Sequence, residues 1–132
     1  MPASGTQTIL VVEDWPELKD LYTAILKRGG YNVISAWDGF EALEQARAAK
    51  PDLIFMHVHL DGIDGYETYR RLKNDAATKD IPVILNSATD SAFERALALQ
   101  AGIEGYLVKP FAAGELLDMV DSALKRRRLG IH

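Results

Sequence analysis

A buried strand that runs into a polar loop is written in the stretch Pro51-Asp52-Leu53-Ile54-Phe55-Met56-His57-Val58-His59-Leu60-Asp61-Gly62-Ile63-Asp64-Gly65. Four apolar residues run without alternation from Leu53 to Met56, which is typical of a strand covered on both faces of a sheet. The apolar run stops at His57. In an open parallel sheet, ligands and reacting groups collect just beyond the carboxyl ends of the strands. His57 therefore lies where a reacting or ligand-binding side chain is expected.

The composition is that of one ordinary globular domain. The chain has 132 residues, of which 48% are hydrophobic and 26% are charged. Its net charge of -4 argues against direct nucleic acid binding by this domain. The lack of cysteine excludes thiol catalysis and zinc sites built on thiolates, and it fits a reducing compartment. No apolar run approaches the ~18–20 residues of a membrane span, so we expect no membrane association and a cytoplasmic location.

Strand patterns and helix patterns alternate five times along the chain. Strands are expected at residues 8–12, 31–36, 53–56, 81–85 and 106–108, and helical spacing is carried by residues 18–26, 40–46, 66–74, 93–100 and 116–124. Alternation with short connections predicts an α/β fold, a three-layer αβα sandwich around a parallel sheet. We expect one domain over residues 8–125, a disordered lead-in over 1–7 and a basic C-terminal tail over 126–132.

Local signals add four expectations. Asp14 is placed to cap the first helix. Pro82 is tolerable because it stands at the start of the fourth strand. Trp15 and Trp37 are expected to pack half-buried. The basic run 125–128 suits a helix C-terminus and is expected to be solvated, with a linker or a docking patch as the alternative.

Polar side chains follow four of the five expected strands. Glu13 and Asp14 follow the first strand, His57 ends the third, Ser87 follows the fourth, and Lys109-Pro110 follows the fifth. Because the carboxyl ends of parallel strands share one edge, these groups should converge on one pocket. An acid pair suits a hard cation such as magnesium, and a lysine with a hydroxyl suits phosphoryl oxygens.

The chain resembles the receiver domains of the two-component response regulators, which are CheY-like. The resemblance is carried by Ile9-Leu10-Val11-Val12-Glu13-Asp14, Asp38-Gly39, Glu41-Ala42-Leu43, Pro51-Asp52-Leu53-Ile54, Asp64-Gly65, Ile81-Pro82-Val83-Ile84, Ala101-Gly102 and Tyr106-Leu107-Val108-Lys109-Pro110-Phe111. These pieces occur in order and cover nearly the whole chain from Thr8 to Leu124.

The resemblance implies a flavodoxin-like, doubly wound sheet in the order 2-1-3-4-5. It implies that the acid pair binds magnesium and that the residue ending the third strand accepts phosphate from a sensor histidine kinase. It further implies that Ser87 and Lys109 contact the phosphoryl group, that Pro110 follows a cis peptide bond, and that Tyr106 is a switch aromatic. Helix four, strand five and helix five form the family's usual surface for dimerisation and output, so a homodimer through that face is expected.

The sequence departs from the family at the centre of this site. His57 stands where the family has its acceptor aspartate, and Asp61 stands where a proline is usual. Forming an aspartyl phosphate needs a carboxylate nucleophile, so we do not expect phosphorylation of His57 in the usual way. Without that carboxylate, magnesium is expected to bind weakly if at all, through Asp14 and the backbone carbonyl of His59, and no other cofactor is expected.

Three readings of His57 stay open. It plugs the pocket by hydrogen-bonding Glu13 or Asp14 and holds the domain in one signalling state. It becomes a cation, because two carboxylates raise its affinity for a proton while Lys109 opposes this, and so makes the domain respond to pH. Or it joins Glu13 and Asp14 in binding a softer divalent ion such as zinc or manganese.

The predicted function is an atypical receiver domain that signals through protein–protein interaction and is not an enzyme. One alternative is an active phosphorelay receiver with an unusual acceptor, or one whose native acceptor has been replaced by engineering. An alternative from another class is a metal-dependent hydrolase that uses Glu13, Asp14 and His57.

Overall fold

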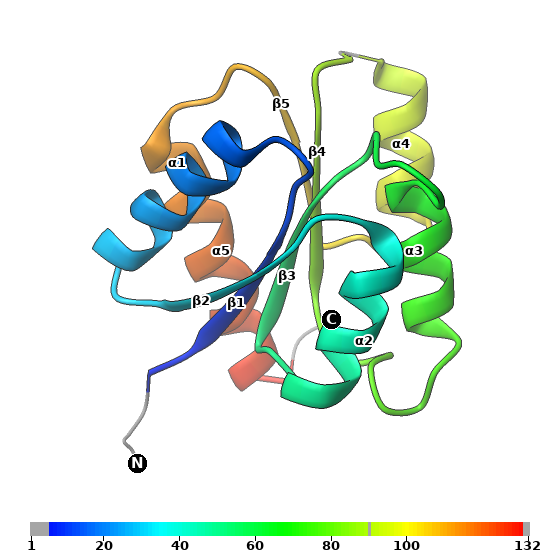
Figure 1. Cartoon of the computed structure of the whole chain (residues 1–132), viewed down its shortest axis with the longest axis horizontal. Coiled ribbons are helices and arrows are strands. Elements are labelled where there is room, and N and C mark those ends of the chain that lie inside the picture. The colour runs from blue at the N-terminus through cyan, green and yellow to red at the C-terminus, as the bar shows by residue number, and fades with distance from the viewer. Residues whose placement is uncertain (1–5, 90, 131–132) are drawn as a thin grey trace.

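The computed structural model describes residues 6–89 and 91–130, and shows five strands and five helices in strict alternation (Figure 1). In chain order they are β1 (Thr8–Val12), α1 (Pro16–Arg28), β2 (Asn32–Ala36), α2 (Gly39–Ala49), β3 (Leu53–His57), α3 (Gly65–Lys73), β4 (Val83–Ser87), α4 (Ala92–Gln100), β5 (Gly105–Val108) and α5 (Ala113–Arg128). The expected α/β alternation is confirmed.

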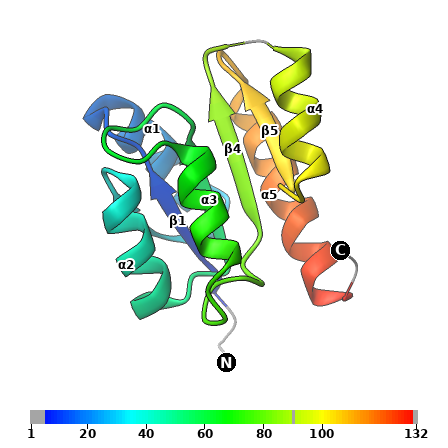
Figure 2. The same cartoon turned by 90° about the vertical axis from the view of Figure 1, so that its right-hand side faces the viewer.

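The strands form one parallel sheet in the order β2-β1-β3-β4-β5, which confirms the order implied by the family resemblance. Helices α1 and α5 cover one face, and α2, α3 and α4 cover the other (Figures 1 and 2). All strands point the same way, so their carboxyl ends lie along one edge.

Alternate residues of each strand feed two separate cores. On β3, Leu53 and Phe55 face the α1/α5 side, whereas Ile54 and Met56 face the other helices. All four are fully buried, which explains why the strand reads as an unbroken apolar run. Phe55 packs edge-on against the rings of Tyr22 and Phe111, with centroids 5.2 and 6.1 Å away.

Several local expectations are corrected by the structure. Asp14 does not cap α1: the N-cap position falls on Trp15, and no side chain caps the helix there. Strand β4 starts at Val83, after Pro82 rather than before it, because proline has no N–H for the sheet ladder. Trp15 and Trp37 are 64% and 66% exposed rather than half-buried, since both lie in the connections that follow the ends of β1 and β2.

The chain ends also differ from expectation. Residues 1–5 of the expected disordered lead-in lie outside the described residues, but the carbonyl of Gln7 accepts a 2.9 Å hydrogen bond from the Asn32 N–H. Helix α5 continues through Arg128, beyond the tail boundary expected at residue 126. Its basic end is not merely solvated, because Arg126 pairs with Glu104 and Arg127 donates to the carbonyl of Asp52 at 2.6 Å.

Among the described residues, no helix is both long enough and apolar enough to cross a membrane.

Candidate functional site

The polar residues that follow the strands are brought to one edge of the sheet by backbone pairing. The N–H of Glu13 donates to the carbonyl of Ala36, which extends the β1–β2 pairing beyond β1. The N–H of Lys109 donates to the carbonyl of Ser87 at 2.8 Å, which fixes the end of β5 beside the end of β4. His57 is the last residue of β3 and lies opposite Asn86 of β4.

His57 faces the two carboxylates. Its Nδ1 atom is 3.3 Å from Oε2 of Glu13 and 3.8 Å from Oδ1 of Asp14. These are ion-pair distances, but the geometry makes no hydrogen bond, and Nδ1 is buried without a hydrogen-bond partner among the described residues. The side chain as a whole is only 15% exposed. A buried polar atom without a partner is costly, so Nδ1 is a point where a proton or a ligand would be stabilised.

Glu13 is the buried anion at the centre of this group. Its Oε1 is 3.5 Å from Nζ of Lys109, and its Oε2 accepts a 3.3 Å hydrogen bond from the Trp15 N–H. Burial raises the pKa of Glu13, but the neighbouring His57 and Lys109 lower it more, so the pKa lies below its ordinary value of 4.5. Glu13 therefore carries its negative charge at neutral pH.

Asp14 is the more exposed of the two carboxylates, with 36% of its side chain open to solvent. Burial and the neighbouring Glu13 raise the pKa of Asp14 above its ordinary value. One atom each from Glu13, Asp14 and His57 lies within 4.8 Å of the others, which is a spacing that can hold a metal ion.

The donor set fits magnesium only in part. Magnesium takes oxygen ligands in a strict octahedron, and the two carboxylates are donors of that kind. The third donor is an imidazole nitrogen, which suits transition metals instead. The site thus combines two magnesium-type ligands with one that does not match.

The two phosphoryl-contact candidates have defined positions. Ser87 is fully buried, and its Oγ accepts a 3.0 Å hydrogen bond from the Thr89 N–H. The Nζ of Lys109 lies 5.8 Å from the centre of the Tyr22 ring, on the side of the sheet that carries α1. The Lys109–Pro110 peptide bond is cis.

The loop that follows β3 is packed tightly against the end of the strand. The N–H of Gly65 donates to the carbonyl of Val58 at 2.7 Å, and Asp64 caps α3 by accepting from the Glu67 N–H. A Cβ atom on Gly65 would lie 2.8 Å from the carbonyl oxygen of His57, so only glycine fits. The exposed ring of His59 meets the His57 ring edge-on, with centroids 5.9 Å apart.

Tyr106 of β5 is buried. The residue is 7% exposed, and its hydroxyl lies 3.3 Å from the hydroxyl of Tyr66 on α3. Burial and this contact raise the pKa of Tyr66. In the sequence, Tyr66 reads only as a residue of the helix expected at residues 66–74. The pairing depends on how α3 packs against β5, so no signal in the sequence could have shown it.

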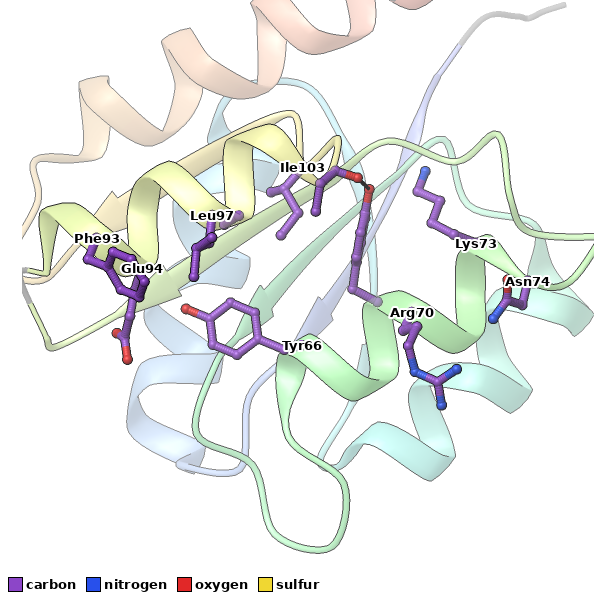
Figure 3. Close-up of a pocket in the computed structure, with 11 residues that line it drawn as sticks. Tyr66, Arg70, Lys73, Asn74, Phe93, Glu94, Leu97 and Ile103 are labelled. Carbon is purple, nitrogen blue, oxygen red and sulfur yellow. Dashed lines mark hydrogen bonds between the residues drawn. The ribbon is translucent and has the colours of Figure 1, made fainter.

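A largely apolar groove separates α3 from α4 (Figure 3). Its volume is about 660 Å³, and its walls include Tyr66 and Tyr69 from α3, Phe93 and Leu97 from α4, and Ile103. Phe93 is 73% exposed at one end of the groove. The sequence does not reveal this groove because both helices read simply as amphipathic.

Comparisons with known proteins agree with this geometry. The family model of the response regulator receiver domain matches residues 9–121. Protein PilG of Pseudomonas aeruginosa is 36% identical over 85% of this chain and 83% of its own length. The regulatory protein PhoP of Bacillus subtilis, named for alkaline phosphatase synthesis, is 37% identical over 92% of the chain, which spans 50% of PhoP.

Solved structures give the same result. A putative response regulator from Chloroflexus aurantiacus is 33% identical and superposes with a TM-score of 0.87, covering 92% of this chain and 100% of that one. The receiver domain of the sensor histidine kinase PA1611 from Pseudomonas aeruginosa, which has a magnesium ion in its active site cleft, is 32% identical. It superposes with a TM-score of 0.83 over 92% of this chain and 99% of that one. The chain thus belongs to the response regulator receiver domain family of two-component signalling.

Proposed function

We propose that this chain is an atypical receiver that signals through protein contacts, without phosphorylation at the usual acceptor position. One observation carries the proposal: the side chain at the end of β3 is an imidazole, with its Nδ1 3.3 Å from the buried carboxylate of Glu13. An acyl phosphate forms only on a carboxylate oxygen, and the end of β3 offers none.

The neighbouring acids are poor substitutes for the missing acceptor. Asp64 already accepts a 2.8 Å hydrogen bond from the Glu67 N–H as the cap of α3. Asp61 is exposed on the loop, four residues beyond His57. Neither acid stands at the strand end beside Glu13 and Lys109, where charge on a transferred phosphoryl group would be stabilised.

The remaining parts of the proposal follow from the same substitution. Loss of the acceptor carboxylate weakens magnesium binding, because Glu13 and Asp14 alone supply oxygen. The domain acts as a signalling module and not as an enzyme, with a sensor histidine kinase or another signalling protein as its partner. The expected cytoplasmic location belongs to this proposal as well.

The contact surface in this proposal is the face formed by α4, β5 and α5. Helix α4 has three large apolar side chains that are about half exposed or more: Phe93 and Leu97, which line the groove beside α3, and Leu99, which does not. Exposed apolar side chains gathered on one helix favour a protein interface. A homodimer through this face is the simplest form of that interface.

Phosphorylation is tested with a small phosphodonor. The protein and a His57→Asp variant are incubated with magnesium and acetyl phosphate, and their intact masses are measured. We expect a single phosphoryl adduct on the His57→Asp variant and none on the protein itself. A stable adduct on the unsubstituted chain would sink the proposal and establish an active receiver with an unusual acceptor.

Two controls locate any adduct and check the contact face. An Asp61→Asn variant removes an acid from the same loop and should behave like the parent protein. Sedimentation of a Leu99→Asp variant should show weaker self-association than the parent, because Leu99 is an exposed apolar side chain of α4 that does not line the groove beside α3. An unchanged association constant would exclude α4 from the interface.

A further inference from the structure

Two carboxylates and one imidazole converge at the carboxyl ends of β1 and β3. They are the imidazole of His57, the buried carboxylate of Glu13 and the partly exposed carboxylate of Asp14. One ligand atom from each lies within 4.8 Å of the other two. His57 Nδ1 is buried, points into this group, and makes no hydrogen bond within the described part of the chain.

The distances match a small cation with nitrogen and oxygen ligands. A tetrahedral zinc ion with bonds of about 2.0–2.1 Å holds its ligand atoms about 3.3–3.4 Å apart. Nδ1 of His57 is 3.3 Å from Oε2 of Glu13, which already meets that spacing. It is 3.8 Å from Oδ1 of Asp14, and the exposure of that side chain leaves it room to close the difference.

Glu13 divides its two oxygens between different neighbours. Oε1 faces the ammonium of Lys109 at 3.5 Å, while Oε2 faces His57. Lys109 therefore orients the carboxylate from the opposite side, as the outer partners of metal-binding carboxylates do. The two carboxylates outnumber this one ammonium, so the group attracts a divalent cation.

The nitrogen decides which cation is preferred. An imidazole nitrogen with carboxylate oxygens suits zinc and other first-row divalent metals, whereas magnesium and calcium prefer oxygen alone. From this geometry we propose that Glu13, Asp14 and His57 form a binding site for a divalent transition metal, with zinc as its preferred ion and water completing the coordination. The exposed part of Asp14 leaves the cluster open to solvent for that water.

This inference goes beyond the proposed function, because metal binding is measured here without a phosphodonor or a protein partner. The experiment is calorimetric titration of the whole chain with zinc, manganese and magnesium salts separately. We expect one saturable zinc site per chain and at least tenfold weaker magnesium binding. In the long-range proton–nitrogen NMR spectrum, zinc should shift Nδ1 of His57.

Matched variants locate the site. His57→Ala and Glu13→Gln should each weaken zinc binding at least tenfold, while Asp61→Asn, which removes a charge from the same loop, should leave it unchanged. His57→Asp keeps a ligand at the position and should reverse the preference toward magnesium. Far-ultraviolet circular dichroism checks that each variant is folded. If Glu13→Gln is unfolded, His57→Asp serves as the decisive variant.

Three results would overturn the proposal. Zinc binding that survives His57→Ala would place the ion elsewhere. Zinc titration that moves the nitrogen signal of His59 and leaves Nδ1 of His57 in place would do the same. Magnesium binding as tight as that of zinc in the parent protein would show that the imidazole does not ligate.

Discussion

Replacing Gly65 by alanine should destabilise the domain and displace the end of β3. Gly65 is the first residue of α3, and its N–H donates to the carbonyl of Val58 at 2.7 Å. A methyl group there would lie 2.8 Å from the carbonyl oxygen of His57, 2.9 Å from the Cα of Val58 and 3.3 Å from the Val58 carbonyl oxygen. All three atoms belong to the backbone, so no side chain can rotate to make room.

The size of the effect follows from these distances. Ordinary contact begins near 3.4 Å, so α3 and the end of β3 must separate by about 0.6 Å. Forcing extra atoms into packed structure costs about 1–3 kcal/mol, and the gain in helix propensity from glycine to alanine returns about 0.5–1 kcal/mol. We expect a net loss of about 1–2 kcal/mol in the free energy of unfolding.

Urea denaturation followed by circular dichroism measures this loss. With an m-value of about 2 kcal/mol/M, the midpoint should fall by about 0.5–1 M. Gly114→Ala is the matched control: Gly114 lies near the start of α5, and an added Cβ meets nothing within 4 Å. That variant should gain up to about 1 kcal/mol. If Gly65→Ala is stabilised like Gly114→Ala, the close approach of Gly65 to the backbone of His57 and Val58 does not exist in solution.

Three further variants test the core, a helix cap and an ion pair. Phe55→Ala should cost about 3–5 kcal/mol in the free energy of unfolding, measured by urea denaturation, because a fully buried ring that touches two others is lost. Asp38→Ala should lower the same free energy by about 0.5–2 kcal/mol, because the side chain caps α2; an unchanged midpoint would contradict the cap. The pKa of Glu67 is lowered to about 2 by hydrogen bonds from Arg70 and Arg71, so these ion pairs stabilise the domain at neutral pH and lose their effect as pH falls from about 4.5 toward 2. Replacing both arginines by alanine should return the pKa of Glu67 toward 4.5 in an NMR titration of its carboxyl carbon, and a pKa that stays low would contradict this.

The fold could be predicted largely because its information is local. Each strand of the sheet centre is a short apolar run, and each helix carries a stripe at helical spacing. The order of the strands is not local, since it depends on which crossover packs on which face, and it came from the family resemblance.

The composition of the site could be predicted from the parallel sheet, but its contacts could not. Three parallel strands, β1, β3 and β5, end at or just before Glu13, His57 and Lys109, so the sequence predicts that these residues share one edge of the sheet. Which oxygen of Glu13 faces which neighbour depends on rotamers that packing selects, and no sequence pattern reports them. The roles assigned to Ser87 and Tyr106 stay predictions.

Expectations based on average behaviour failed where the edge of the sheet is open. Tryptophan is usually well buried, but Trp15 and Trp37 follow the ends of β1 and β2 and are largely exposed there. Aspartate before a helix usually caps it, but Asp14 is one residue too early and lies beside His57 instead. In both cases the residue lies at the edge of the sheet that carries the site, and its position there differs from what is usual for its residue type.

The two exposed tryptophans have a practical consequence for spectroscopy. The chain contains no others, and both stand on the edge of the sheet that carries Glu13, Asp14 and His57. The backbone N–H of Trp15 donates a hydrogen bond to Oε2 of Glu13, so the indole is attached directly beside the site. Intrinsic fluorescence of this protein is therefore a built-in reporter of the open edge and a weak reporter of the core, where the light-absorbing rings are tyrosine and phenylalanine.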